Sequence, residues 1–315
     1  MPILTAPAAG GTAARKVAAA PARRQPWAAI LTAAVALLGL CILLYPSTAA
    51  WVSQLQQSEV VNRYSQAVTG QDSVSSENAV QLARAYNEFV TGGGQVAAGV
   101  RVPVGSGSGA APYDYNSLLE ADSTGLMARL KIPSIGVDLP IYHGTSDATL
   151  ELGIGHLEGS SLPIGGLDTH AVLTGHRGLA SAELFTHLDR MRVGDTFTIE
   201  VFGQVLSYQV VSTHVVEPDQ TESLFPQAGK DLVTLVTCTP LGINSQRILV
   251  TGERILPTPV SDVQQAGERS DLPGFPWWLV WLSTGVVLIG AYLWWNLRLA
   301  KPRGGYEGDS DGDIH

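Results

Sequence analysis

The chain has 315 residues, 45% of them hydrophobic, a length and composition that allow one large or two small domains with a hydrophobic core. Its formal net charge at pH 7 is −9; residues 1–26 and 296–315 hold seven of the 19 basic and four of the 28 acidic side chains, which leaves 12 basic against 24 acidic between them. So acidic a central segment argues against nucleic acid as a partner and against a basic patch that binds anionic lipid.

Two uncharged apolar runs border the central segment, at residues 27–45 and 276–295. Each is long enough to cross about 30 Å of hydrocarbon as a helix, and Trp residues at their ends suit a membrane interface. The flanking basic residues all lie outside the central segment: Arg15, Lys16, Arg23, Arg24, Arg298, Lys301 and Arg303. The positive-inside rule therefore predicts a two-pass protein of the cell membrane with both termini in the cytoplasm and an extracellular central segment.

The first run has an alternative interpretation as a cleaved signal peptide. The residues "STAA" after Pro46 resemble a small-residue cleavage site. The apolar core of the run is longer than that of a typical signal peptide, which favours a retained anchor.

The central segment begins with a predicted helical region and a glycine-rich stretch. Within residues 46–90, helix is expected from residue 51, and Val80, Ala83 and Tyr86 recur at helical spacing. Residues 91–114 show neither the helical nor the strand period, which indicates a loop or linker.

From Gly125 onward the pattern changes to short β-rich runs separated by Gly and Pro. In residues 197–210, apolar and polar residues alternate on both sides of a turn at Gly203. Further strands are predicted at residues 127–132, 137–142, 171–174, 232–237 and 247–253, and one helix at residues 181–191. Seven or eight short strands predict a mostly β fold, a closed or nearly closed barrel over about 130 residues.

Cys238 ends an apolar, β-branched run, "TLVTCTP", and is the only cysteine between the two apolar runs, since Cys41 lies in the first of them. An unpaired exported cysteine suggests an intermolecular disulfide or a reactive thiol, and a buried structural cysteine is the third possibility. A thiol is a useful nucleophile at neutral pH when a nearby imidazolium or guanidinium favours the thiolate.

The central segment offers six histidines that could activate this thiol: His143, His156, His170, His176, His187 and His214. Spacing alone does not choose among them. His176, in "VLTGHRG", follows an apolar strand and lies between glycines, where a side chain can project into a cleft. No HExxH or CxxC spacing occurs, so neither a metal site nor a cofactor is predicted.

Arg247 opens the last predicted strand, nine residues after Cys238. If the strands at 232–237 and 248–250 are neighbours joined by "TPLGIN", Cys238 and Arg247 face each other at the mouth of the hairpin. The alternative is an ordinary surface arginine at a strand end.

These motifs together resemble those of a sortase. "TLVTC" is followed nine residues after its cysteine by an arginine, and "TGHRG" lies 62 residues before that cysteine. The flanking segments resemble the class C, or pilin-assembling, sortases of Gram-positive bacteria: "KIPSIGVDLPIYHGTS", "GIGHLEGSSLPIGG", "HAVLTGHRGLASAELFTHLDRMRVGDTF" and "VVEPDQTESLF". The resemblance covers residues 115–255.

The resemblance implies an eight-stranded sortase-type β-barrel in which Cys238 is the nucleophile and His176 and Arg247 complete the catalytic set. It selects His176 over the other five histidines, and it implies a structural role for His143. The expected reaction is cysteine transpeptidation: cleavage of an LPxTG-like sorting signal between Thr and Gly on an exported protein, and transfer of the acyl group to an amine, a pilin lysine. No metal or other cofactor is implied.

The chain departs from the class C pattern in one respect. Such sortases often cover the active site with a lid that carries Asp-Pro-aromatic, a tripeptide that this sequence lacks. The glycine-rich stretch occupies the place of the lid, and Asp114 and Tyr115 are its candidate lid residues.

The predicted organisation then has eight parts in chain order: cytoplasmic tail 1–26, transmembrane helix 27–45, extracellular helical segment 46–90, lid-like loop 91–114, catalytic barrel 115–257, linker 258–275, transmembrane helix 276–295 and cytoplasmic tail 296–315. Three alternatives stay open at this point. They are a housekeeping-type sortase that anchors proteins to peptidoglycan, a hydrolytic cysteine protease, and a non-catalytic, membrane-tethered β-barrel adaptor with an inert Cys238.

Overall fold

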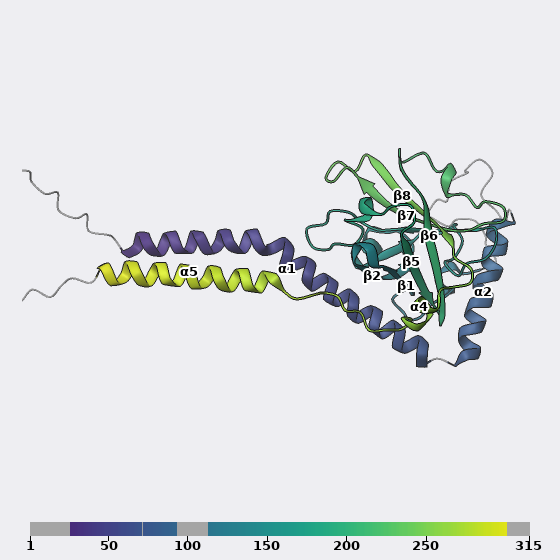
Figure 1. Ribbon diagram of the computed structural model, residues 1–315, viewed down its shortest axis with the longest axis horizontal. Helices are drawn as coiled ribbons and strands as arrows, with labels where there is room; N and C mark the ends of the chain where they lie inside the picture. Colours follow the sequence, from purple (N-terminus) through teal and green to yellow (C-terminus); the bar gives the residue numbers. More distant parts are fainter. Residues whose placement is uncertain (1–25, 71, 93–112, 301–315) are drawn as a thin grey trace, which may run out of the picture. The chain divides into compact units, whose positions relative to one another are not determined.

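The computed structural model describes residues 26–70, 72–92 and 113–300 (Figure 1). Most of the predicted lid-like loop and of the two predicted tails lies outside these residues. The described residues form two compact units, one from residue 44 to residue 278 and one from the two apolar ends of the chain. Each is described by itself.

The larger unit is built on an eight-stranded closed β-barrel, which confirms the predicted fold class. Around the barrel the strands follow the order β1-β2-β3-β4-β7-β8-β6-β5. Their bounds are β1 Leu126–Ile132, β2 Val137–His143, β3 Ile154–His156, β4 Thr169–Thr174, β5 Thr196–Val201, β6 Gln204–Val216, β7 Asp231–Thr239 and β8 Gln246–Arg254. Pairs β2/β3 and β4/β7 are parallel and the others antiparallel. Four 3₁₀ helices lie between strands or before β1: Tyr115–Ser117, Pro133–Ile135, Leu188–Arg190 and Glu222–Leu224.

The β5–β6 hairpin shows how the sequence pattern forms this barrel. Phe197, Ile199 and Val201 are fully buried in the core, as their alternation predicts. Phe202 and Gly203 form a two-residue turn with φ of 43° and 80°, the left-handed conformation that tight hairpins require. The strand after the turn, β6, continues to Val216, six residues beyond the predicted end at residue 210.

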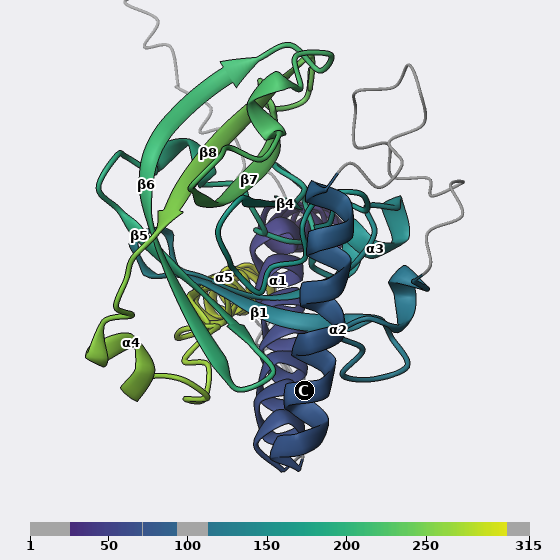
Figure 2. The ribbon, with the colours of Figure 1, turned by 90° about the vertical axis from the view of Figure 1, so that its right-hand side faces the viewer.

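Helix α2 (Ser73–Thr91) covers one side of the barrel (Figure 2). Val80, Ala83 and Tyr86 are buried in the main core, so the helical spacing seen in the sequence is the face that packs. The side chain of Asn87 accepts a hydrogen bond from the backbone N–H of Leu162 at 2.6 Å and donates one to its C=O at 3.1 Å.

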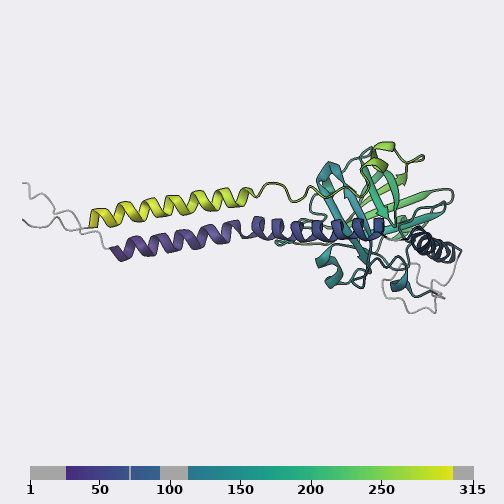
Figure 3. The ribbon, with the colours of Figure 1, turned by 90° about the horizontal axis from the view of Figure 1, so that it is seen from below.

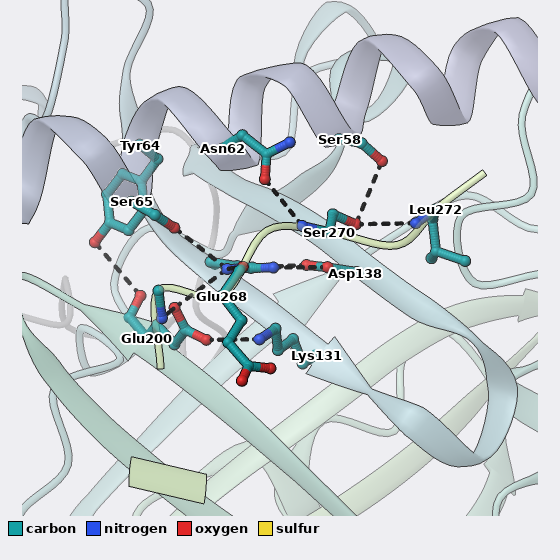
Figure 4. A network of polar contacts seen from close by, with 12 residues as sticks. Ser58, Asn62, Tyr64, Ser65, Lys131, Asp138, Glu200, Glu268, Ser270 and Leu272 are labelled. Carbon is teal, nitrogen blue, oxygen red and sulfur yellow. Dashed lines mark hydrogen bonds and ion pairs between the residues drawn. The ribbon is translucent and has the colours of Figure 1, made fainter. Parts of the chain in front are cut away.

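The buried side chain of Arg129 on β1 joins the barrel to two segments outside it, and its partners Ser65, Asp138, Glu200 and Glu268 are labelled in Figure 4. The side chain of Arg129 is fully buried; its Nε and Nη2 donate to the two carboxylate oxygens of Asp138 at 2.7 and 2.8 Å, and its Nη1 lies 3.4 Å from Glu200 Oε2. The same Nη1 donates to Ser65 Oγ in helix α1 (Pro26–Gly70) at 3.2 Å and to the backbone O of Glu268 at 2.8 Å. Burial lowers the pKa of Arg129, but the hydrogen bond and charge of Asp138, then those of Glu200, raise it above its ordinary value.

The segment after the barrel, which includes α4 (Val260–Gln264), returns along α1 (Figure 3). The backbone N–H of Ser270 donates to Asn62 Oδ1 at 2.9 Å, and Trp51 Nε1 donates to the backbone O of Gly274 at 2.9 Å. The residues of α1 after residue 44 and the chain near residue 270 are therefore held side by side on the barrel.

Within the residues that the structure describes, two helices are long and apolar enough to cross a membrane: the first part of α1 and helix α5 (Trp277–Ala300). Helix α1 continues past Pro46 without a break, so the first apolar run and the helix predicted after it form one element. Within the smaller unit the side chain of Leu40 packs against Gly285, where an added methyl group would clash with it.

One predicted element is wrong. Residues 181–191, "SAELFTHLDRM", form turns and the short 3₁₀ helix Leu188–Arg190 instead of an α-helix. Leu184 has a φ of 38°, and the backbone N–H of Phe185 donates to the C=O of His176 at 3.0 Å, so this segment folds back onto the end of β4.

Strand β3 was not predicted, because three residues are too few to show a period.

Candidate active site

Cys238 and Arg247 are neighbours across the β7–β8 ladder. The two residues are opposite each other in the antiparallel register, as the hairpin predicted. Opposite residues of such a pair lie about 4.5–5.5 Å apart at Cα and project to the same face of the sheet. The sulfur and the guanidinium therefore emerge on the same side.

His176 directly follows the stretch of chain that pairs with β7 on the edge opposite β8. The parallel strands β4 and β7 pair up to Thr174 and Val236, and Gly175 continues this register. Its backbone N–H donates to the C=O of Val236 at 3.0 Å, and Thr237 Oγ1 donates to the C=O of Gly175 at 2.7 Å. The loop that begins with His176 therefore starts beside the end of β7, where Cys238 lies.

Exposure changes sharply at this point of β7. Residues 231–237 are buried, whereas Cys238 and Thr239 are half-buried. His176 and Arg247 are half-buried as well. All three side chains thus lie at the rim of the barrel, where the strands leave the core, and Cys238 is not sealed in the protein interior.

The guanidinium of Arg247 is held by the loop that joins β7 to β8. Its Nη1 donates to the backbone C=O of Asn244 at 2.9 Å and to that of Gln246 at 3.0 Å. Asn244 adopts a left-handed conformation with φ of 58°, which an Asn tolerates well. The loop therefore positions the guanidinium through its own backbone.

Arg177, next to His176, connects the loop after β4 to the end of β7. Its Nη1 donates to Thr239 Oγ1 at 2.9 Å, its Nε to the C=O of Thr186 at 3.2 Å, and its Nη2 lies 2.8 Å from Asp189 Oδ2. The side chain is only 8% exposed. It thus ties the residue after Cys238 to the segment that follows His176. No pattern in the sequence predicts this role for Arg177, although it directly follows His176.

Close packing also fixes the backbone before His176. A Cβ on Gly175 would lie 2.7 Å from the ring of Phe185 and 2.8 Å from Ile154. Any side chain at position 175 would therefore clash, and the backbone that leads to His176 packs directly against the core.

Most of the other histidines have structural partners. His156 is fully buried, with Nδ1 2.8 Å from Tyr115 Oη and Nε2 2.8 Å from the C=O of Ser161. His170 is buried against Thr234 and the C=O of Phe225, and His143 lies between the carbonyls of Leu118 and Gly125. His187 is half-buried and His214 is exposed on β6. In the described residues, His176 is the histidine that directly follows the β4–β7 ladder, at the end of β7 where Cys238 lies.

The two candidate lid residues, Asp114 and Tyr115, lie at the start of the barrel domain, before β1. Tyr115 is 6% exposed, its hydroxyl donates to the C=O of His156 at 3.1 Å, and its ring lies edge-on to that of His143. Asp114 caps the 3₁₀ helix that starts at Tyr115 by accepting from the backbone N–H of Asn116 at 3.2 Å. These contacts anchor the start of the barrel domain, and the rest of the predicted lid, residues 93–112, falls outside the described residues.

The buried His156 makes stability depend on pH. Burial lowers its pKa to about 4, below the ordinary 6.5, so it is neutral in the folded protein while the unfolded chain takes up a proton below pH 6.5. Its contribution to stability is fully present above pH 6.5 and is lost as the pH falls from 6.5 towards 4. Between pH 7 and pH 4.5, the unfolding free energy of the wild type should fall by about 2–3 kcal/mol more than that of His156→Gln. Urea denaturation at the two pH values measures both decreases. Equal losses in the two proteins would contradict this assignment.

A groove of about 610 Å³ adjoins His176. Its lining residues come from three places in the larger unit: α1, the short helix α3 (Asp147–Leu152), and the loop after β4. They are Tyr45, Thr48, Ala49, Val52, Ser53, Gln56, Glu151, His176, Leu179, Ser181 and Ala182. The groove was not predictable from the sequence, because its α1 wall lies at the junction of the predicted membrane and extracellular helices.

Comparison with known proteins gives a consistent result. The sortase domain family model matches residues 130–255. Sortase D of Bacillus subtilis is 31% identical over 129 residues, which are 40% of this chain and 62% of that protein. The match thus spans less than two thirds of this curated relative.

Solved structures cover more of the chain. Sortase C1 of Streptococcus agalactiae matches with 41% identity and a TM-score of 0.58, over 64% of this chain and 100% of that one. Sortase C of Streptococcus pneumoniae matches with 39% identity and a TM-score of 0.56, also over 64% of this chain and 100% of that one. The family model, the barrel and these neighbours confirm the resemblance: the chain belongs to the sortase family and groups with its class C members.

Proposed function

We propose that this chain is a membrane-anchored cysteine transpeptidase that cleaves an LPxTG-like sorting signal between Thr and Gly and joins the acyl group to a pilin lysine. The observation that carries this proposal is the pairing of half-buried Cys238 with Arg247 across β7 and β8, with His176 directly after the stretch of chain that pairs with β7 on its other edge. Its similarity to the S. pneumoniae sortase C, a protein with pilin substrate specificity, supports the choice of acceptor.

Each of the three side chains has a role in this reaction. The Cys238 thiolate attacks the carbonyl carbon of the Thr and forms a thioester after the C–N bond to Gly breaks. His176, as imidazolium, gives a proton to the departing Gly amine and then accepts one from the incoming amine. Arg247 donates hydrogen bonds to the oxyanion that develops on the substrate carbonyl.

In the proposed topology, the two apolar helices cross the cell membrane and both termini are cytoplasmic, so the barrel faces the outside. Anchored enzyme and anchored substrate would then meet at raised effective concentration. Exported proteins with LPxTG-like signals are accordingly the proposed partners.

The test uses the full chain in detergent micelles with Leu-Pro-x-Thr-Gly peptides in which x is varied. Mass spectrometry is expected to show release of the part after Thr and an acyl adduct on Cys238. A lysine peptide, a peptidoglycan-type amine and water then compete for this adduct. An amide bond to lysine supports pilin assembly, an amide to the peptidoglycan amine supports a housekeeping role, and free acid alone supports a hydrolase. Absence of any adduct on Cys238 would contradict the proposal and favour the adaptor alternative.

A further inference from the structure

The groove beside His176 has one helical wall and one loop wall. Six of its lining residues lie on α1 at positions 45, 48, 49, 52, 53 and 56, the i, i+3, i+4, i+7, i+8, i+11 pattern. Such spacing is a single face of a helix. With a rise of 1.5 Å per residue this face is about 16 Å long, enough for about five residues of an extended peptide.

The opposite wall is made of Leu179, Ser181 and Ala182, which follow β4, and of Glu151 on α3. Glu151 is the acidic residue among those that line the groove, and it is exposed. The small side chains on both walls leave room for a main chain, and the single carboxylate favours a cationic side chain over an anionic one.

The position of the groove relative to the chemistry limits what it can bind. His176 lines the groove, whereas Cys238 does not. The groove therefore opens on the imidazole side of the Cys238 sulfur. In the proposed reaction the incoming amine gives its proton to His176, so it must approach the thioester from this side.

We propose that this groove binds the peptide segment that carries the acceptor lysine, and that Glu151 pairs with its ammonium group. The inference rests on the proposed transpeptidase function. The bound ammonium gives one proton to the neutral imidazole of His176, and the free amine attacks the thioester carbonyl. A C–N bond forms, the nitrogen releases its second proton to water, and the C–S bond breaks with its electron pair returning to Cys238 as thiolate. The thiolate and the imidazolium of the starting state are both restored.

The test separates acylation from aminolysis in the full chain in detergent. The acyl donor is a Leu-Pro-x-Thr-Gly peptide, and the acceptor probe is acetyl-Ala-Ala-Lys-Ala-Ala-amide. Glu151→Lys reverses the charge of the groove and Ser53→Phe narrows it from the α1 side. Glu88→Lys, an exposed glutamate on α2 outside the groove, is the matched control. Hydroxylamine serves as a small nucleophile that needs no groove.

We expect Glu151→Lys to raise the KM for the lysine peptide about ten-fold, because repulsion replaces a solvent-exposed charge pair. Ser53→Phe should lower aminolysis by the peptide as well. The rates of Cys238 acylation and of hydroxylamine cleavage should stay within two-fold of the wild type in both variants (~0.4 kcal/mol), and Glu88→Lys should change nothing.

Two results would overturn the inference. One is lysine-peptide kinetics unchanged in both groove variants. The other is an equal fall in acylation, hydroxylamine cleavage and lysine transfer, which would make the groove part of general folding or of donor binding. A wild-type protein that forms no acyl adduct at all would instead overturn the proposed function itself.

Discussion

Replacement of Cys238 by alanine is expected to abolish acyl transfer, with at least a roughly 10³-fold loss in rate, because a catalytic nucleophile acts as a unit with its base and cannot be replaced by its neighbours. The alanine variant should form no acyl adduct with an LPxTG-like peptide, and it should release no product above the rate without enzyme. Adduct formation is measured by intact-protein mass spectrometry, and product release by chromatography of the peptide.

The same substitution should leave the fold intact. Cys238 is half-buried at the end of β7, beyond the last buried residue of the strand, so its truncation costs little, about 1 kcal/mol or less. The melting temperature therefore distinguishes a lost nucleophile from a lost fold. Cys41, exposed within the first apolar run, is the matched control: Cys41→Ala should keep full activity. An active Cys238→Ala protein would rule out the thioester mechanism.

Replacement of Arg129 by methionine is expected to cause the largest loss of stability, about 3–5 kcal/mol, because it leaves two buried carboxylates without their main partner. Asp138 would lose two hydrogen bonds and Glu200 one ion pair, and Lys131, 3.1 Å from Glu200, compensates the second carboxylate only in part. For a folded unit of this size the melting temperature should fall by about 6–20 °C. Thermal unfolding followed by circular dichroism measures the change.

An exposed ion pair provides the control for this prediction. Lys230 and Glu253 are 3.6 Å apart with more than two fifths of each side chain exposed. Lys230→Met should lower stability by no more than about 1 kcal/mol, because solvent already screens the pair. Equal losses in the Arg129 and Lys230 variants would show that the buried network contributes no more than a surface pair.

Much of the fold could be predicted, since it depends on local pattern. Alternation of apolar residues marked β5 and the start of β6, and the helical recurrence of Val80, Ala83 and Tyr86 marked the buried face of α2. Local pattern failed where long-range contacts decide the conformation. Residues 181–191 have a helical pattern, yet a hydrogen bond from Phe185 to His176 folds them back as turns.

The sequence by itself determined which residue types are available for chemistry: one cysteine between two apolar runs, an arginine nine residues after it, and six histidines that it did not rank. Only a family resemblance selected His176, because no spacing along the chain encodes which strands become neighbours. The tertiary structure decided which strands are neighbours: β4 pairs in parallel with β7, which brings residues 62 positions apart, such as Thr174 and Val236, side by side. It also decided that Arg129 and Arg177 are buried in polar networks and that a groove lies beside His176, since each depends on surfaces from distant parts of the chain that meet only after folding.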